Sequence, residues 1–482
     1  MDADTLRRLA AAVDRDALLT ATEDVKAYEC DGLTGHRAVP AAVILPRSTE
    51  QVAACVRICH QARVPFVARG AGTGLSGGAL PVVGGVVICL ARMDAVLHVD
   101  VDNARVVVQP GVANAAVTAA VAPFGFYYAP DPSSQLVCSI GGNVAENSGG
   151  AHCLKHGFTT NHVAGAVMVT AGGRIAELGG AVCDTPGYDL LGAVVGSEGT
   201  LGIVTEVTLQ VLRRPDTVRM LLAAFSSIED AANAVSRIVA AGVLPAAVEM
   251  MDSLTREASE QAVHPGYPDC DALLLVEVDG PAVECVAQLD QCRAICEDAG
   301  AFEIRVAEDE AERALMWRGR KAAFAAMGRV SPSYYVQDGV VPRTRLPEVL
   351  RSISALAREY GLRVGNVFHA GDGNLHPLVC YDAGVEGEAT RAMELAGRIL
   401  DVCIAAGGSI TGEHGVGHDK ACAMPKMFSP GALTVMDRVR AAFDPDGLCN
   451  PGKVLPTPRL CGEVPGFHRA HPLEAAGLAE RW

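Results

Sequence analysis

Two histidines lie on either side of an Asp-Gly dipeptide in the segment His369-Ala370-Gly371-Asp372-Gly373-Asn374-Leu375-His376. Asp-Gly favours a two-residue hairpin turn, and the flanking segments, Val364 to Phe368 and Pro377 to Tyr381, are rich in strand-forming residues. In the register that this turn predicts, His369 faces His376 across the hairpin, and directly opposed residues have Cβ atoms roughly 4.5–5.5 Å apart. Two imidazoles at that spacing can bind one divalent metal ion.

A third candidate metal ligand is Glu413, which lies beside His414 in the segment Gly412 to Gly417. Two histidines and one carboxylate leave a coordination position open, which is typical of a catalytic rather than a structural metal site. The sequence therefore predicts a site for zinc or manganese at His369, His376 and Glu413. A histidine pair alone is more often a packing feature, and a metallohydrolase could use the same three ligands.

The elements that position these residues follow from the hydropathy pattern. Residues 40–215 combine short apolar runs with glycine-rich turns, and residues 217–365 alternate strands and helices with few glycines, which suits an antiparallel sheet with helices on one face. The predicted fold class is therefore α+β. The predicted strands are Ala41 to Leu45, Pro65 to Ala68, Val86 to Leu90, Arg105 to Gln109, Val218 to Phe225, Ala246 to Met251 and Ala272 to Val278. The predicted helices are Glu50 to Ala62 after a cap at Ser48 or Thr49, Ser227 to Ala241, Ala282 to Asp298, Glu308 to Met327 and about Glu386 to Ala406.

Three glycine-rich loops occur within the first 204 residues. The first, Gly72 to Gly77, matches the dinucleotide fingerprint, but residues 78–85 cannot form the helix that this fingerprint requires. We therefore expect residues 69–78 to form a non-helical nest of backbone N–H groups for a phosphate. A second loop covers residues 131–150 and a third covers residues 196–204. Three such loops favour one large extended cofactor over a single phosphate.

These loops resemble the FAD-binding domain of the vanillyl-alcohol oxidase, or PCMH, type of flavoprotein. The resemblance extends from about residue 40 to residue 455, and it is closest to the D subunits of glycolate oxidase and to D-lactate and D-2-hydroxyglutarate dehydrogenases. The motifs that carry it occur in the expected order: Arg69 to Gly78, Gly141 to Gly150, Gly196 to Val204, His369 to His376, Gly412 to Gly417, and Asn450-Pro451-Gly452-Lys453.

The resemblance implies an FAD-binding domain and a ferredoxin-like antiparallel cap domain. The expected divisions are a helical segment at 1–39, the FAD-binding domain at 40–215, the cap with the metal site at 216–420, a segment returning to the FAD domain at 421–456, and a tail at 457–482. The residues implied in non-covalent FAD binding are Arg69, Gly70, Ala71, Gly72, Thr73, Gly74, Leu75, Ser76, Asp131, Pro132, Ser133, Ser134, Gly141, Gly142, Asn143, Asn147, Ser148, Gly149, Gly150, Glu198, Gly199, Gly202, Ile203, Val204 and Asn450.

The implied reaction is oxidation of a small 2-hydroxy acid by hydride transfer to flavin N5. The metal would hold the substrate hydroxyl and lower its pKa. Glu413 and His414 are neighbours whose side chains diverge in extended chain, so one can bind the metal while His414 takes the hydroxyl proton. Arg320, three positions after Trp317, corresponds to the arginine that binds the substrate carboxylate in this family. Relatives that oxidise hydroxyglutarate have a lysine two residues before an aspartate, whereas this chain has Val336 before Asp338, which favours glycolate or D-lactate.

Composition limits the partners and the location. The net charge of −16 argues against nucleic-acid binding. The chain has no Cys-x-x-Cys motif, which excludes the usual iron–sulfur patterns, so electrons would need a separate acceptor. In glycolate oxidase the implied partners are a second flavin subunit and an iron–sulfur subunit, and a homodimer is also compatible with the sequence. With no apolar run of membrane-spanning length and no secretory start, we expect a cytoplasmic protein, with peripheral membrane attachment only through partners. A non-catalytic flavoprotein subunit is the alternative function.

Overall fold

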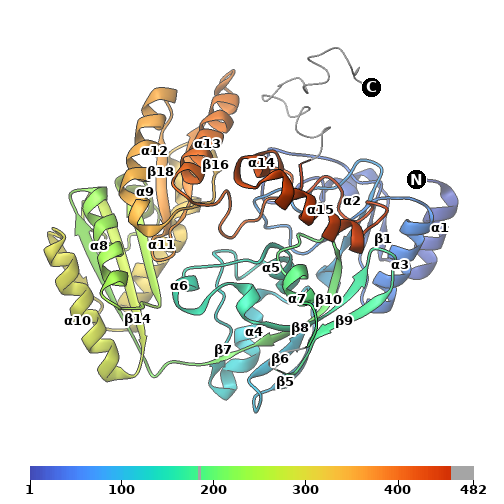
Figure 1. Cartoon of the computed structure of the whole chain (residues 1–482), viewed down its shortest axis with the longest axis horizontal. Helices are drawn as coiled ribbons and strands as arrows, with labels where there is room; N and C mark the ends of the chain where they lie inside the picture. The colour runs from blue at the N-terminus through green and yellow to red at the C-terminus, as the bar shows by residue number, and fades with distance from the viewer. Residues whose placement is uncertain (183–185, 457–482) are drawn as a thin grey trace.

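The computed structural model describes residues 1–182 and 186–456, so the predicted tail at 457–482 lies outside the described residues. Figure 1 shows two parts side by side, with the N-terminal sheets on the right and a large sheet on the left. Among the described residues, no helix has both the length and the apolar character that crossing a membrane requires. The predicted domain boundaries stay predictions.

The first sheet has the strand order β1-β2-β4-β3, and β2, β4 and β3 run parallel. Its strands are β1 (Leu18–Leu19), β2 (Ala42–Ile44), β3 (Phe66–Arg69) and β4 (Val86–Cys89). The accompanying helices are α1 (Ala3–Ala12), α2 (Thr22–Lys26) and α3 (Thr49–Gln61). The predicted cap of α3 is confirmed, because the Ser48 hydroxyl accepts a hydrogen bond from the Gln51 N–H at 3.3 Å.

The second sheet is antiparallel, in the order β5-β6-β10-β8-β9. Its strands are β5 (Val96–Asp100), β6 (Arg105–Val108), β8 (Val163–Thr170), β9 (Ile175–Gly179) and β10 (Gly202–Gln210). A two-stranded ribbon pairs β7 (Phe126–Tyr127) with β11 (Leu212–Arg213). The helices of this region are α4 (Asn114–Val121), α5 (Ile140–Glu146), α6 (Cys153–His156) and α7 (Leu190–Val194).

The large sheet has nine strands. Seven of them follow the order β15-β12-β14-β13-β18-β19-β17; in addition, β20 pairs with β18, and β16 pairs with β20. Every recorded strand pair in it is antiparallel. The strands are β12 (Thr217–Phe225), β13 (Ala247–Asp252), β14 (Ala272–Gly280), β15 (Glu303–Val306), β16 (Ser333–Val336), β17 (Gly339–Val340), β18 (Val364–His369), β19 (Asn374–Leu375) and β20 (Pro377–Tyr381).

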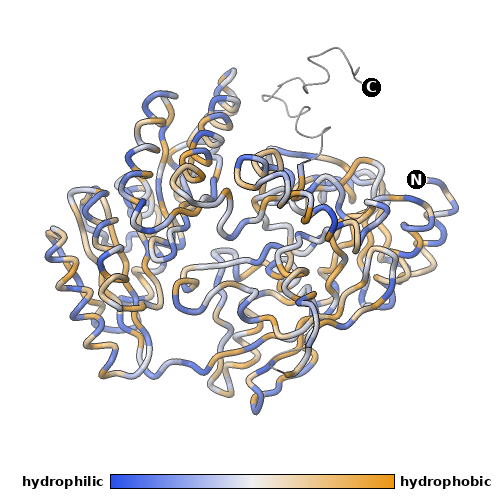
Figure 2. Tube along the Cα trace, viewed as in Figure 1, coloured by the Kyte–Doolittle hydropathy of each residue, from blue (hydrophilic) through white to orange (hydrophobic). Residues whose placement is uncertain are grey.

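Helices cover both faces of the large sheet, so the prediction of helices on one face is wrong. On one face, core residues of β12 such as Leu221 pack with α8 (Ile228–Ala240), α10 (Ala282–Asp298), α12 (Leu346–Tyr360) and α13 (Glu388–Ala405). On the other, alternate residues of β12 such as Leu222 pack with α9 (Ser253–Val263) and α11 (Glu310–Ala326). Figure 2 shows hydrophobic and hydrophilic residues alternating along these helices, as helices that cover a sheet require.

The hairpin that carries the two histidines has a different register from the predicted one. His369 pairs with Asn374 rather than with His376, and β20 pairs with the start of β18 through Asn366 and Pro377. The connection is therefore longer than the Asp-Gly turn alone, and Gly373 N–H donates to His369 O at 3.2 Å. His376 is a diagonal neighbour of His369, and their rings still meet edge to face with centroids 5.1 Å apart.

The C-terminal segment packs against the first sheet after α14 (Met424–Met427) and α15 (Pro430–Phe443). Phe66 of β3 donates its N–H to Leu448 O at 2.9 Å, and Asn450 N–H donates to Phe66 O at 2.8 Å. The buried Lys453 Nζ donates to Leu80 O at 2.9 Å. These bonds join the segment at 448–453 to residues on either side of the first glycine loop.

Candidate functional site

A cavity of about 1080 Å³ lies between the glycine loops and the large sheet. Its lining also includes residues that the sequence did not single out, namely Asp31 to Arg37, Lys321, Phe324, Tyr334, Tyr335, Tyr381 and Met393. The predicted site residues that line it are Arg69, Gly70, Ala71, Gly72, Thr73, Gly74, Leu75, Pro132, Ser133, Ser134, Gly141, Gly142, Asn143, Ser148, Glu198, Gly199, Gly202, Ile203, Val204, Glu413 and His414. Segments distant in sequence thus converge on one space that is large enough for an extended cofactor.

The remaining predicted cofactor residues, Ser76, Asp131, Asn147, Gly149, Gly150 and Asn450, do not line this cavity. Asn450 joins two of its loops, because its Nδ2 donates to Gly78 O at 2.9 Å and to Glu198 O at 2.7 Å. Asn147 ends α5 in the left-handed conformation. The Asp131 carboxylate points to His152, whose Nδ1 lies 2.9 Å from Asp131 Oδ2. These side chains shape the loops rather than face the cavity.

Part of the second loop is helical, which corrects its prediction as continuous loop. Ser139 caps α5 by accepting from Gly142 N–H at 3.3 Å, and the helix runs from Ile140 to Glu146. Gly141 is needed for close packing, because a Cβ there would lie 2.6 Å from Pro110 Cβ. The helix presents Gly142 and Asn143 to the cavity.

The three predicted metal ligands meet at one buried point. Glu413 Oε1 lies 3.4 Å from His369 Nε2 and 3.2 Å from His376 Nε2. Atoms that each lie about 2.1 Å from a tetrahedral zinc ion are about 3.4 Å apart, so these separations suit a common metal. His369 Nε2, both ring nitrogens of His376 and Glu413 Oε2 are buried without a hydrogen-bond partner. Because buried polar atoms are otherwise paired, the donor set fits a divalent ion.

Glu249, which the sequence patterns did not identify, contacts two of the predicted site residues. Its Oε1 accepts from His369 Nδ1 at 2.7 Å, and its Oε2 accepts from Arg320 Nε at 2.6 Å. The first bond leaves His369 Nε2 free to ligate a metal, which is the usual arrangement of a metal-binding histidine. Arg320 is 2 % exposed, and its terminal NH2 group is buried without a partner. Arg320 therefore lies next to the predicted metal site and has an unpaired N–H donor.

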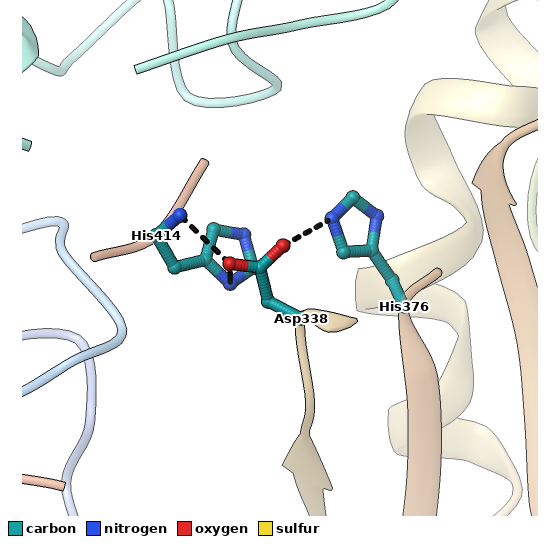
Figure 3. Close-up of side chains that lie close together, drawn as sticks. All are labelled: Asp338, His376 and His414. Atoms are coloured by element: carbon teal, nitrogen blue, oxygen red, sulfur yellow. Dashed lines mark hydrogen bonds and ion pairs between the residues drawn. The ribbon is translucent and has the colours of Figure 1, made fainter. Parts of the chain in front are cut away.

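Asp338 organises the loop that carries Glu413 and His414, as Figure 3 shows for its two histidine neighbours. Asp338 Oδ2 accepts from Thr411 Oγ1 at 2.6 Å and from the N–H groups of Gly412 and His414 at 2.9 Å each. His376 Nε2 lies 3.6 Å from its other oxygen. One buried carboxylate therefore fixes the backbone on which the predicted base is carried.

The electrostatics of the cluster keep its acids ionised. Burial alone would raise the pKa of Glu413, but His369 and His376 lower it well below 4.5. Burial likewise opposes ionisation of Asp338, while His414 and Lys420 lower its pKa well below 3.8. Burial lowers the pKa of His414 to about 4. The imidazole of His414, stacked on His376 with centroids 5.0 Å apart, is therefore neutral and able to accept a proton.

Comparison with known proteins identifies the family of the chain. Residues 40–179 match the FAD binding domain family, and residues 214–454 match the family of FAD linked oxidases, C-terminal domain. The glycolate oxidase subunit GlcD of Escherichia coli (strain K12) is 50% identical over 455 residues, covering 94% of this chain and 91% of that protein. GlcD of Bacillus subtilis (strain 168) is 38% identical, covering 89% and 92%. A D-lactate dehydrogenase of Anaerostipes hadrus is 34% identical, covering 87% and 90%.

Solved structures share the fold at low sequence identity. The 4-ethylphenol oxidase of Gulosibacter chungangensis superposes with a TM-score of 0.77 at 19% identity, covering 94% of this chain and 97% of that one. p-Cresol methylhydroxylase superposes with a TM-score of 0.75 at 15% identity, covering 94% and 96%. Together with the sequence matches, these likenesses confirm the α+β fold of the vanillyl-alcohol oxidase type. The chain therefore belongs to the FAD-linked oxidases and is an oxidoreductase.

Proposed function

We propose that this oxidoreductase converts a small 2-hydroxy acid, glycolate or D-lactate, to the 2-oxo acid with the help of a divalent metal. The observation that carries the proposal is the position of Glu413 and His414. Both line the cavity of the glycine loops, while Glu413 Oε1 also contacts the histidine pair. A candidate metal centre and a neutral base thus share one wall of the proposed cofactor cavity.

The glycine loops that line the cavity would hold FAD without a covalent link. FAD supplies, when bound, the two-electron acceptor for the substrate hydride. Backbone N–H groups of residues 69–75 would bind the pyrophosphate, and residues 132–134, 141–143 and 198–204 would surround the rest of the cofactor. Asn450 and Lys453 would support FAD binding indirectly, because their side chains hydrogen-bond to the backbone of the loops.

His414 and Arg320 would divide the work on the substrate. The guanidinium of Arg320 offers the buried, unpartnered NH2 group to the substrate carboxylate. The neutral imidazole of His414 accepts the proton of the 2-hydroxyl. His369, His376 and Glu413 would hold the metal, whose charge makes the hydroxyl more acidic.

The wall near Val336 favours a substrate with a short side chain. Val336 lines the cavity together with Phe324 and Met393. The cationic side chains that line the cavity, Arg37, Arg69 and Lys321, lie on other segments. Val336 itself offers no cation at the position where relatives that oxidise hydroxyglutarate have a lysine for the second carboxylate, and an unpaired carboxylate is costly in a desolvated site. Glycolate and D-lactate have no second carboxylate, so we propose them as substrates ahead of D-2-hydroxyglutarate.

Electrons leaving the flavin need an acceptor outside this chain. The GlcD relatives are named as subunits of glycolate oxidase. We infer that this chain also works with partner subunits, one with flavin and one with an iron–sulfur centre. The homodimer is the alternative assembly.

Anaerobic bleaching of the bound flavin tests the proposal. Glycolate or D-lactate should reduce the flavin, whereas L-lactate should not, and D-2-hydroxyglutarate should react more slowly. Failure of all four acids would refute 2-hydroxy acid oxidation. His414→Ala should retain FAD and lose the reduction, and a normal rate in that variant would remove the base assignment.

Chelation tests the metal separately. Dialysis against a chelator should abolish substrate reduction of the flavin while leaving FAD bound, and zinc, manganese or cobalt should restore it. Full activity in protein shown to contain no metal would contradict the metal site.

A further inference from the structure

His152 lies between two carboxylates that belong to different parts of the fold. Its Nδ1 is 2.9 Å from Asp131 Oδ2, and its Nε2 is 3.1 Å from Glu277 Oε1. Ionised carboxylates only accept hydrogen bonds, so both ring nitrogens must donate, and only the imidazolium form can do this. The side chain is 24% exposed and its backbone N–H also donates to Asp131 Oδ1 at 3.3 Å.

Each of the two carboxylates is linked to a segment that lines the cavity. Asp131 precedes Pro132, Ser133 and Ser134, which line it. Glu277 of β14 accepts from Trp317 Nε1 on α11 at 2.7 Å, and Lys321 and Phe324 of the same helix also line the cavity. His152 thus connects the 131–134 loop to helix α11 through a continuous chain of hydrogen bonds.

Helix α11 also carries Arg320, three residues after Trp317. On a helix, residues three apart lie on neighbouring turns of one surface. A displacement of Trp317 relative to the 131–134 loop would therefore move Arg320 relative to the same loop. Arg320 in turn holds Glu249, the partner of His369.

We propose that His152 is a positioning residue for substrate oxidation: its bridge from Asp131 to Glu277 sets the position of α11, and with it of Arg320, relative to the 131–134 loop. The inference rests on the proposed function for its kinetic consequence. The bridge itself rests on the contacts alone.

Lys155 provides a matched control. It lies one turn beyond His152, and its Nζ donates to the backbone oxygen of Asp279 at 2.8 Å and to the carboxylate of that residue. It therefore joins the same two segments, α6 and β14, but its hydrogen bonds and ion pair go to Asp279 and not to α11. Loss of Lys155 removes one contact between α6 and β14 but leaves the hydrogen bonds from His152 through Glu277 to Trp317 intact.

The experiment compares His152→Gln, His152→Ala and Lys155→Ala as FAD-loaded proteins. Stopped-flow reduction by D-lactate and glycolate should be about tenfold slower or more in both His152 variants, because small displacements of a positioning group are costly. Lys155→Ala should stay within about twofold of the wild type. FAD content serves as the folding check, and His152→Gln keeps most of the side-chain volume should His152→Ala unfold.

Two further measurements separate positioning from general damage. The double variant Trp317→Phe/His152→Gln should reduce its flavin no more slowly than the slower single variant. Both substitutions interrupt the same chain of hydrogen bonds, so their effects should not add. Chain fluorescence in a Trp482→Phe background, where Trp317 is the only tryptophan, should shift to longer wavelength in His152→Gln and not in Lys155→Ala. This second measurement needs no substrate.

The outcomes are distinct. If no 2-hydroxy acid reduces the wild type, the proposed function fails, and the fluorescence comparison still decides whether the bridge holds α11. If the wild type is reduced and both His152 variants match it, the positioning role is overturned. Equal losses in His152→Gln and Lys155→Ala would also overturn it, because they would show attachment without specific alignment.

Discussion

The Nδ1–H of His369 donates to Glu249 Oε1 at 2.7 Å, which orients the opposite ring nitrogen toward Glu413. The two residues sit opposite each other on neighbouring strands, in the registered pair between β13 and β18. Directly opposed strand residues share a face, so the large sheet itself sets the ring orientation. Of the three proposed ligands, His369 is therefore oriented by the sheet, through a carboxylate that would not touch the metal.

Replacing Glu249 tests this arrangement. Glu249→Gln keeps the size of the side chain but removes the charge that faces His369 and Arg320. We expect metal affinity to fall about 10–100-fold, as it does when the outer partners of ligating histidines are removed. Competition with a chelator, followed by metal analysis, measures the change.

Glu303, exposed on the edge strand β15, supplies the control. Glu303→Gln should bind metal like the wild type. Equal metal affinity in the Glu249 and Glu303 variants would contradict an orienting role for Glu249.

Asp338 should stabilise the fold as well as the loop at 411–414. Asp338→Asn leaves several buried donors with a weaker acceptor, and we expect a loss of about 3 kcal/mol in the free energy of unfolding. Thr411→Val removes only one of the donors and should cost about 1 kcal/mol. Denaturant unfolding of the FAD-loaded variants measures both, and similar losses in the two would contradict the central position of Asp338.

The sequence predicted the large elements because their signals are local. The helix after Ser48 has a capping hydroxyl and apolar spacing, and the strand at 217–225 contains the continuous apolar run Met220 to Phe225. The same run is buried on both sides, as a strand between two helical layers is. The sequence therefore does indicate that α9 and α11 cover the second face, because a strand buried on one face only would alternate apolar and polar residues.

The site was predicted only where residues form contiguous motifs. Glu249 lies on β13 and Asp338 lies between β16 and β17. Each is a single acid distant in sequence from the histidines, and only the tertiary fold brings them together. The hairpin register failed for a related reason: Asn374 is held by β17 as well as β18, so tertiary pairing overrode the preference of Asp-Gly for a two-residue turn. Asp131 was assigned to the cofactor through the family resemblance, and no local sequence signal marks its contact with His152.

Gly141 should be required for the cavity wall formed by α5. In Gly141→Ala, the added Cβ would lie 2.6 Å from Pro110 Cβ and 3.1 Å from Pro110 O, so the helix must move. Overpacking of this kind costs about 1–3 kcal/mol, and we expect FAD binding to weaken by about tenfold or more. Gly172→Ala is the control, because nothing lies within 4 Å of a Cβ there. Equal FAD retention in both variants, measured by ultrafiltration, would contradict this role for α5.

The contribution of His152 to stability should depend on pH. Burial alone would lower the pKa of His152, but Asp131 and Glu277 raise it well above 6.5. The charged groups of α11 that line the pocket beside this bridge are Glu310, Arg313, Arg318 and Lys321. Arg313 Nη1 lies 3.6 Å from Glu277 Oε2. A raised pKa in the folded state means that the stabilisation is complete below about pH 6.5 and is lost as the pH rises through the folded pKa.

The measurement compares melting temperatures of the FAD-loaded wild type and His152→Gln from pH 5.5 to 10. The wild type should be the more stable protein at acidic pH, and the difference should shrink as the solution becomes alkaline. A difference that stays constant over the whole range would show that the imidazolium charge contributes nothing.

Val336 offers a test of substrate length. In Val336→Lys, an ammonium group would enter the cavity wall at a position where the chain now offers a second substrate carboxylate only an apolar side chain. A hydrogen bond to a charged group contributes about 1.5–3 kcal/mol, so kcat/KM for D-2-hydroxyglutarate relative to D-lactate should rise about tenfold or more. Val336→Met adds length without charge and should leave that ratio unchanged. If the methionine and lysine variants shift the ratio equally, cavity shape rather than charge at residue 336 selects the substrate.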